Sequence, residues 1–217
     1  MTIKGSAQNA LLDDIKLTDY YRNKQLVGNL QDSELVKNYS FLAPLFHSKS
    51  KILYCSSGAV YGKQPLDLEK IDEDFKFKDD LSDLSQGKRA YCLNKRYAES
   101  EILNLGKSGL SVSIARCFAF SGKYLPKDQH YAYGNFIGQA ERGETVIVKT
   151  NGIVYRSYME ADDLVISLFK ILSISSPICP IYNIGSENEI SLYDLAKIIA
   201  NKYNVYYKFD NSIQYHL

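Results

Sequence analysis

Apolar segments rich in β-branched residues alternate along this chain with segments of helical periodicity. That alternation limits the fold to an α/β domain with a largely parallel sheet. With 217 residues, 45% of them hydrophobic, the chain can bury a single core. We expect strands at 52–55, 111–115, 146–148 and 181–184, and helices at 33–46, 89–105, 135–141, 162–171 and 192–199.

Local signals fix several of these boundaries. Ser191, followed three residues later by Asp194, forms an acidic version of the capping box and predicts a helix start. Gly106 and Gly109 predict the end of the helix over 89–105. The polar stretch 62–88 is expected to be a long loop.

Charge and composition exclude several classes of function. A formal net charge of +1 gives no long-range field for nucleic acid or an anionic membrane. The four cysteines form no Cys-x-x-Cys pair and the three histidines have no ligand spacing, so we expect no metal site and a reduced, cytoplasmic chain. The N-terminus has no apolar core of the signal-peptide type, and nowhere do eighteen apolar residues run together, so no membrane segment is expected.

Tyr91 and Lys95 stand four residues apart in a predicted helix, after a strand that runs into Ser56 and Ser57. A phenol titrates near 10 when unperturbed, so it can act as an acid or base at neutral pH only if a nearby cation stabilises its anion. Lys95, one turn along the same face, can supply that charge. Taken alone, the pair also fits an ordinary helix surface, because the spacing arises by chance in a chain rich in Tyr and Lys.

A nucleotide-binding α/β fold normally begins with a strand, a glycine-rich turn and a helix whose first amides hold a pyrophosphate. The thirteen glycines of this sequence nowhere give G-x-G-x-x-G, G-x-x-G-x-x-G or G-x-x-x-x-G-K-[ST]. The usual phosphate cradle is therefore not encoded in these residues.

Five motifs in order resemble the extended short-chain dehydrogenase/reductases, specifically the NAD-dependent epimerase/dehydratase family that modifies nucleotide sugars. They are Ser56-Ser57-Gly58-Ala59-Val60-Tyr61-Gly62 with Tyr91-x-x-x-Lys95, then Arg116 to Gly122, Gly134-Asn135-Phe136-Ile137, Arg156 to Leu164, and Tyr182-Asn183-Ile184-Gly185-Ser186. The resemblance implies an incomplete Rossmann-like, doubly wound parallel sheet that lacks its first βαβ unit, with a small substrate-binding part at the C-terminal end.

The resemblance also implies roles for individual residues. Tyr91 would be the acid/base at the sugar, Lys95 would bind the nicotinamide ribose and lower the pKa of the phenol, and Ser57 would bind the reacting oxygen. The cofactor would be NAD or NADP, exchanging a hydride with the hexose C4. Its contacts would come from Tyr91 and Lys95 together with Ser56, Cys117 and Phe118.

The implied substrate is a nucleotide-diphosphate sugar. Arg156 would grip the diphosphate with its planar guanidinium, and Asn135 would bind the same ligand through its amide. Alone, Arg156 also fits an ordinary surface arginine and Asn135 a helix cap. We interpret Asp163 as a structural residue at the start of a helix.

Gly58 and Ala59 bear on the type of reaction. Dehydratases of the family often carry an Asp and a Glu at these two positions, where they remove water. Neither Gly nor Ala can move a proton, so the sequence favours a 4-epimerase or 4-ketoreductase over a 4,6-dehydratase.

By comparison with the family, we expect a chain truncated at its N-terminus and near its C-terminus. Within one truncated domain, 1–217, residues 30–130 and 145–170 would form the cofactor and catalytic part, and 131–144 and 171–217 the substrate-binding part. A homodimer is expected by analogy. Two alternatives to an enzyme stay open: a non-catalytic remnant that binds a sugar nucleotide but cannot hold NAD, and a structural protein on the same scaffold.

Overall fold

The computed structural model describes residues 50–64, 70–77, 80–128, 131–150 and 152–210. The first unit consists of the described residues through Arg116 together with Lys170–Asn183, and the second of Cys117–Phe169 and the described residues from Ile184 onward. Each unit has its own hydrophobic core. The helix predicted at 33–46 lies outside the described residues.

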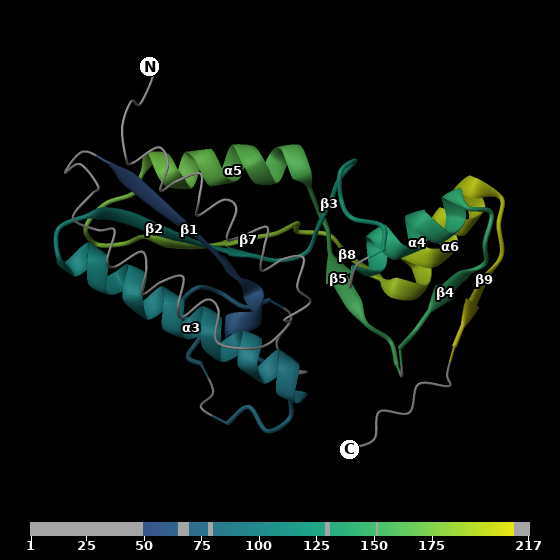
Figure 1. The fold of residues 1–217 in the computed structure, drawn as a ribbon, viewed down its shortest axis with the longest axis horizontal. Helices are drawn as coiled ribbons and strands as arrows, with labels where there is room; N and C mark the ends of the chain where they lie inside the picture. Colours follow the sequence, from purple (N-terminus) through teal and green to yellow (C-terminus); the bar gives the residue numbers. More distant parts are fainter. Residues whose placement is uncertain (1–49, 65–69, 78–79, 129–130, 151, 211–217) are drawn as a thin grey trace. The chain divides into compact units, whose positions relative to one another are not determined.

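A three-stranded sheet has the order β1-β2-β7, formed by β1 (Lys51–Ser57), β2 (Ser111–Cys117) and β7 (Ile181–Ile184). The amide of Ile114 donates to the carbonyl of Pro180 (3.0 Å) and that of Phe118 to Ile184 (2.8 Å). In both bonds the acceptor residue follows the donor residue by the same number of positions in the sequence, which is the pattern of parallel strands. Figure 1 shows β1 running in the same direction. The α/β class with a parallel sheet is therefore confirmed.

Helix α3 (Gln86–Lys107) lies against one face of this sheet (Figure 1). Its side chains Ile102 and Leu105 pack with Val112 and Ile114 of β2 and with Cys179, and this cluster is the core of the first unit. Burying these apolar groups between helix and sheet is the main force that holds the layers together.

Two glycines near the end of α3 have different functions. Gly106 lies inside the helix, where an added Cβ would come within 2.7 Å of the carbonyl oxygen of Pro177, so only glycine allows this close approach. Gly109 follows the helix with φ +98°, a conformation that favours glycine. The helix thus ends at Lys107, two residues later than predicted, and Gly109 rather than Gly106 follows its end.

The segment between β1 and α3 starts with the short 3-10 turn η2 (Gly58–Tyr61), which the sequence did not predict. Val60 and Tyr61 in this turn are fully buried. The described parts of the following loop contain no helix or strand until α3 begins at Gln86, so residues 86–88, predicted as the end of the loop over 62–88, belong to the helix instead.

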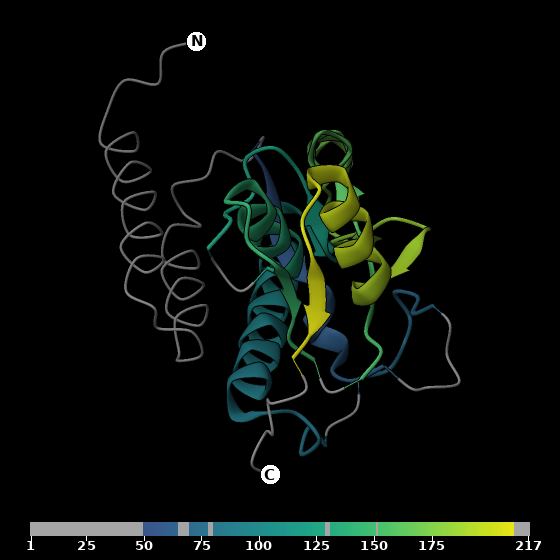
Figure 2. The same ribbon diagram turned by 90° about the vertical axis from the view of Figure 1, so that its right-hand side faces the viewer.

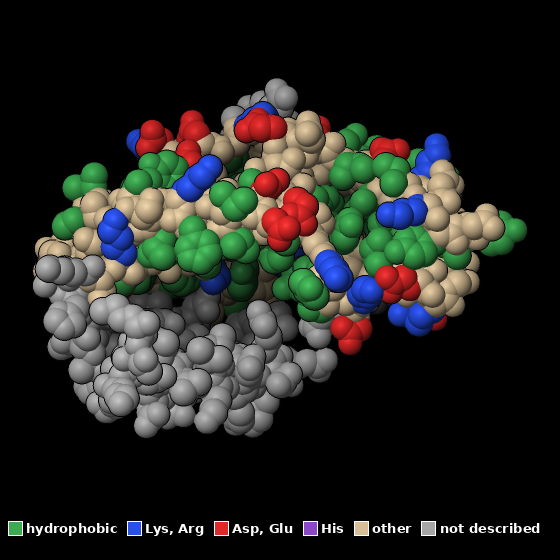
Figure 3. Space-filling view, turned by 90° about the horizontal axis from the view of Figure 1, so that it is seen from above, with side chains coloured by type: hydrophobic (Ala, Val, Ile, Leu, Met, Phe, Trp, Pro, Cys, Tyr) green, Lys and Arg blue, Asp and Glu red, His purple; other side chains and the backbone are tan. Residues whose placement is uncertain are grey.

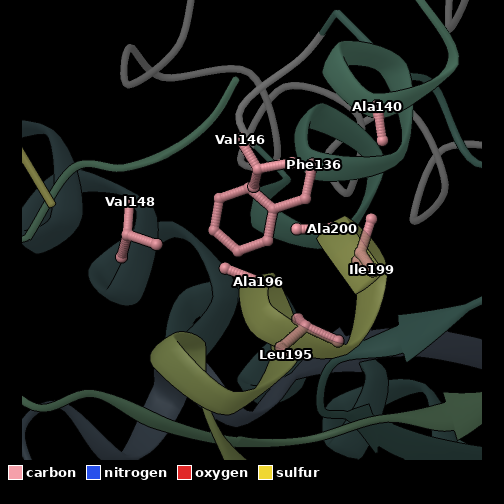
Figure 4. Packing of buried hydrophobic residues seen from close by; sticks show 8 residues of the cluster. All are labelled: Phe136, Ala140, Val146, Val148, Leu195, Ala196, Ile199 and Ala200. Carbon is pink, nitrogen blue, oxygen red and sulfur yellow. The ribbon is translucent and has the colours of Figure 1, made fainter. Parts of the chain in front are cut away.

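The second unit is built on helices α4 (Ala132–Glu141) and α6 (Leu192–Tyr203), which lie side by side in Figures 1 and 2. Strands β4 (Val146–Val148) and β9 (Tyr207–Phe209) pair in parallel beside them. Figure 4 shows their shared core, which consists of Phe136, Ala140, Val146, Val148, Leu195, Ala196, Ile199 and Ala200.

The predicted helix start is confirmed, with Ser191 as the N-cap of α6. The hydroxyl of Ser191 accepts a hydrogen bond from the amide of Asp194 (3.0 Å). It thereby satisfies one of the amides that a helix start leaves without an intrahelical partner.

Four short strands complete the second unit. Strand β3 (Phe120–Ser121) pairs in parallel with β6 (Met159–Glu160), and β5 (Tyr155–Ser157) pairs antiparallel with β8 (Glu189–Ser191). None of them was predicted, because they are two or three residues long and, unlike Val146–Val148, none is a run of β-branched residues.

Helix α5 (Ala161–Ser173) begins directly after β6 and has Asp162 and Asp163 in its first turn. Asp163 is thus a residue of a helix start, as predicted. Acidic side chains there interact favourably with the helix dipole.

Hydrophobic side chains also reach the surface, as the space-filling view shows (Figure 3). On α5 the exposed large hydrophobic residues are Val165, Ile166 and Phe169. No helix in the described part of the chain is both long and apolar enough to cross a membrane.

Candidate active site

The predicted catalytic residues of the first unit lie where the end of β1 meets α3. Ser57 is the last residue of β1, and Tyr91 and Lys95 lie one turn apart in α3. The ammonium of Lys95 donates to the carbonyl of Cys55 at 3.4 Å, two residues before Ser57. Lys95 therefore links the helix that carries Tyr91 to the strand that carries Ser57.

Lys95 also lies close to two phenol rings. Its Nζ is 5.7 Å from the ring centroid of Tyr91 and 5.1 Å from that of Tyr54 on β1. A cation over an aromatic face is attracted by the ring quadrupole, which helps to hold the ammonium beside Tyr91. Tyr91 is 42% exposed, so the residue is open to contact with a ligand.

Ser57 is the N-cap of η2, and its hydroxyl oxygen accepts a hydrogen bond from the amide of Ala59 at 3.2 Å. A serine hydroxyl has one proton to donate and two lone pairs. Because the bond to Ala59 uses a lone pair, Ser57 can still donate its proton to a ligand oxygen.

Ser56, which was predicted to contact the cofactor, faces the interior. It is 5% exposed and its hydroxyl donates to Oε1 of Glu99 at 2.6 Å. Only its backbone could then meet a cofactor, and that contact stays a prediction.

Glu99 belongs to a buried polar network that the sequence analysis missed. Its carboxylate pairs with the guanidinium of Arg116 at 2.8 Å, with the side chains only 4% and 6% exposed. Burial by itself lowers the pKa of Arg116, but the hydrogen bonds and charge of Glu99, with help from Tyr61, outweigh burial and raise the pKa above its ordinary value. Arg116 therefore stays charged inside the unit.

Two signals in the sequence mark Glu99 and Arg116 as unusual residues, although only the fold shows that they pair. Glu99 follows Lys95 at the same four-residue spacing that separates Lys95 from Tyr91, so all three share one helix face. Arg116 is a lone charge near the end of the otherwise apolar and small Ser111–Cys117 strand. A buried strand tolerates such a charge only when a partner lies beside it.

The remaining predicted site residues lie in the second unit. Cys117 is partly buried at the end of β2. The next residue, Phe118, lies close to Gly185: a Cβ added to Gly185 would come within 3.2 Å of the Cβ of Phe118. Gly185 therefore allows the chain to pass close to Phe118. The predicted contacts of Cys117 and Phe118 with a nicotinamide stay predictions.

Asn135 lies in the first turn of α4. Its backbone N–H donates to the carbonyl of Tyr131, which is the N-cap residue. The helix begins three residues earlier than predicted, so the reading of Asn135 as a helix cap is wrong. Its side chain is partly buried.

Arg156 lies on the exposed strand β5, with its Nη1 donating to the carbonyl of Tyr155 at 2.8 Å. Within the described ranges its guanidinium forms no ion pair. Burial raises the pKa of the neighbouring Tyr158, and the positive charge of Arg156 opposes that rise. The guanidinium lies at the surface, where it can bind an anionic ligand.

Comparison with known proteins identifies the family. The profile of the NAD dependent epimerase/dehydratase family matches residues 21–185, which is more than half of the chain. The chain belongs to this family.

Two curated relatives are UDP-glucuronic acid decarboxylases. The chain is 31% identical to UDP-glucuronic acid decarboxylase 3 of Arabidopsis thaliana over 115 residues, 52% of this chain and 33% of the relative. It is 32% identical to UDP-glucuronic acid decarboxylase 1 of Danio rerio over 119 residues, 53% of this chain and 28% of the relative. The matched region thus spans about a third of these relatives.

Solved structures show the same fold. UDP-N-acetylglucosamine 4-epimerase from Bacillus cereus matches with a TM-score of 0.65 and 20% identity, covering 86% of this chain and 64% of that one. dTDP-glucose 4,6-dehydratase from Bacillus anthracis, solved in complex with NAD, matches with a TM-score of 0.59 and 21% identity, covering 82% and 52%. Both comparisons support the Rossmann-like fold of the extended short-chain dehydrogenase/reductases.

Proposed function

We propose that the chain carries the catalytic site of an enzyme that modifies a nucleotide sugar by hydride exchange between NAD or NADP and the hexose C4. One observation carries this proposal: the ammonium of Lys95 lies 5.7 Å from the ring centroid of Tyr91 and donates to the carbonyl of Cys55 at 3.4 Å. A cation beside an exposed phenol is thus bonded to the strand that ends at Ser57.

Each of the three residues has a distinct task. Tyr91 accepts the proton of the sugar hydroxyl when the carbon is oxidised and returns it when the ketone is reduced. Lys95 stabilises the phenolate of Tyr91, which is present before the proton is taken from the sugar and forms again when the proton is returned. Ser57 donates its hydroxyl proton to the reacting oxygen, while Ala59 keeps the serine oriented through its amide.

The described residues fit the nicotinamide end of a dinucleotide. The Lys95 ammonium offers hydrogen-bond donors for a ribose, and Tyr91 is exposed beside it. Ser56, Cys117 and Phe118 would add contacts. When bound, NAD or NADP accepts and returns the hydride. The NAD in the similar dehydratase structure and the NADPH in that of RMD from Pseudomonas aeruginosa support this class of cofactor.

The substrate that we propose is a nucleotide-diphosphate sugar, with a UDP-sugar as the first candidate. The names of the curated relatives support UDP-glucuronic acid in particular. Arg156 would bind the diphosphate, because a planar guanidinium can donate two parallel hydrogen bonds to phosphate oxygens. Asn135 would contribute its amide. Asn135 lies within 131–144, which the sequence assigns to the substrate-binding part, whereas Arg156 would reach the same ligand from 145–170.

The residues after Ser57 favour some reactions over others. Gly58 and Ala59 in η2 carry no group that can move a proton, so we favour 4-epimerisation or 4-keto reduction over 4,6-dehydration. The curated relatives add decarboxylation as a second candidate. A ketone at C4 is β to a carboxylate at C6, and such a ketone stabilises the charge that forms when carbon dioxide leaves.

A turnover experiment tests the proposal. The purified protein is incubated with NAD and, in separate reactions, UDP-glucose, UDP-N-acetylglucosamine and UDP-glucuronic acid, and the products are identified by NMR and mass spectrometry. We expect conversion of at least one sugar. Tyr91→Phe should lower the rate by about 10²- to 10⁴-fold, the usual contribution of an acid/base group.

Tyr97→Phe is the matched control for this experiment. Tyr97 lies on the same helix and is 40% exposed, almost as much as Tyr91. Its replacement should leave the rate unchanged. Equal activity of the wild type and Tyr91→Phe would refute the assignment of Tyr91.

A further inference from the structure

The buried network around Glu99 reaches the strand end that carries Ser57. Tyr91, Lys95 and Glu99 follow one another at intervals of four residues on one face of α3. Lys95 donates to the carbonyl of Cys55 (3.4 Å), and Glu99 accepts the hydroxyl proton of Ser56 (2.6 Å). The same helix face that presents Tyr91 is therefore attached to the two residues just before Ser57.

Arg116 fixes the orientation of the Glu99 carboxylate. Its Nη2 donates to Oε2 at 2.8 Å, and its Nε donates to Oε1 at 3.0 Å and to Oε2 at 3.2 Å. Its Nη1 donates to the hydroxyl of Tyr61 at 2.8 Å and to the carbonyl of Glu73 at 3.2 Å. A guanidinium held at so many points leaves the carboxylate one orientation, with Oε1 toward Ser56.

The turn after Ser57 is held from the same helix. Nε of Arg96 donates to the carbonyl of Val60 at 2.7 Å, and the thiol of Cys92 approaches the same oxygen at 3.6 Å. The hydroxyl of Tyr61 donates to Oδ1 of Asn183 at 2.7 Å. Ser57 thus lies between two points, Ser56 and Val60, that are both bound to α3.

We infer that Glu99 and Arg116 are positioning residues that set the register of α3 against the end of β1, and with it the place of Tyr91 relative to Ser57. A buried ion pair gives little net stability compared with apolar side chains of similar volume. Apolar side chains, however, could not accept the proton of Ser56 or donate to Tyr61 and Glu73. The effect of the pair on turnover rests on the proposed function, whereas its effect on the Ser57 segment does not.

The double variant Glu99→Leu/Arg116→Met separates positioning from stability. It removes both charges together and fills their space with apolar atoms, so the thermal midpoint should stay close to that of the wild type. Amide hydrogen exchange in the peptide 56–62, measured without any ligand, should become about tenfold faster, as expected for the loss of a buried hydrogen bond. Exchange at the wild-type rate in this peptide would overturn the inference.

Two further variants complete this test. Lys127→Leu/Glu141→Met removes an exposed ion pair of the second unit, with its 2.6 Å contact, and should leave the exchange of 56–62 unchanged. Ser56→Ala removes only the hydroxyl that Glu99 accepts, and should accelerate exchange in the same peptide even if the double variant does not fold. An unchanged rate in Ser56→Ala would also overturn the inference.

Kinetics distinguish a positioning role from a structural one. The double variant should lower kcat about tenfold or more while the KM of the nucleotide sugar stays within about twofold, because misplacement affects the transition state more than binding. Wild-type kcat in the folded double variant would overturn the positioning role. If the wild type turns over none of the sugars, the proposed function fails, and the exchange measurements still decide the inference.

Discussion

The two units use their interiors differently. Beside its apolar cluster, the first unit buries the Glu99–Arg116 ion pair together with Ser56 and Tyr61. The buried cluster of the second unit, shown in Figure 4, is formed entirely by apolar side chains from α4, α6 and β4. Apolar contacts are non-directional, whereas hydrogen-bonded charges favour one geometry. The polar interior of the first unit lies beside Ser57 and the helix that carries Tyr91 and Lys95, the residues for which we propose a catalytic role.

Breaking the ion pair from one side should have the largest effect on stability. Arg116→Met leaves the carboxylate of Glu99 buried without its partner, so we expect a loss of about 3–5 kcal/mol in the free energy of unfolding. Since the chain has no tryptophan, urea unfolding is best followed by circular dichroism and tyrosine fluorescence. The Glu99→Leu/Arg116→Met double variant should recover most of the loss. A loss below about 1 kcal/mol in the single variant would mean that the pair acts like an exposed one.

The apolar core of the second unit should respond in proportion to the volume removed. Leu195→Ala in α6 should cost about 2–5 kcal/mol, the usual range for such a buried truncation. Ile198→Ala on the same helix is the control, because Ile198 is 57% exposed and should change the free energy of unfolding far less. Equal losses in the two variants would contradict the proposed core.

The smallest effect concerns the apolar cluster of the first unit and occurs only at high pH. Burial, assisted by the negative charge of Glu99, raises the pKa of the Cys179 thiol to about 11 from its ordinary value of 9.0. The folded state therefore favours the neutral thiol. The contribution of the neutral Cys179 thiol to the free energy of unfolding is complete below pH 9 and is lost as the pH rises toward 11. The free energy of unfolding, measured by urea titration at several pH values, should fall over this range.

Two cysteine variants test whether Cys179 causes this decrease in the free energy of unfolding. Cys179→Ala should reduce the decrease in stability between pH 9 and 11, because the titrating thiol is gone. Cys55→Ala should leave the decrease unchanged, because Cys55 is exposed. The same pH dependence in the wild type and Cys179→Ala would show that this thiol does not titrate as expected.

Most of the longer elements could be predicted from the sequence, since their periodicity and caps are local. The Ser191 cap and the strand over 111–115 are examples, and both are found. The two-residue strand β3 and the start of α4 at Ala132 could not be predicted, because tertiary pairing and packing determine them. Glu99 and Arg116 lie 17 residues apart in the sequence, so only the fold shows that they meet.

The candidate site likewise has one part that could be predicted from the sequence and one part that could not. The spacing of Tyr91 and Lys95 places them on one helix face, and this part of the site could be predicted. The burial of Ser56 against Glu99 could not, because either side of a strand end can face the interior when only one sequence is known. Local patterns thus predicted the reactive groups, and long-range packing determines what orients them.

We propose that Tyr91, Lys95 and Ser57 act where a hydride leaves C4 of a nucleotide hexose. The most direct test of this role is a single-turnover reaction of the protein with NAD and a UDP-sugar deuterated at C4, using the sugar that the turnover experiment identifies. We predict slower cofactor reduction than with the unlabelled sugar, with deuterium recovered on the reduced nicotinamide. Equal rates with both sugars, and no deuterium on the nicotinamide, would contradict the claim.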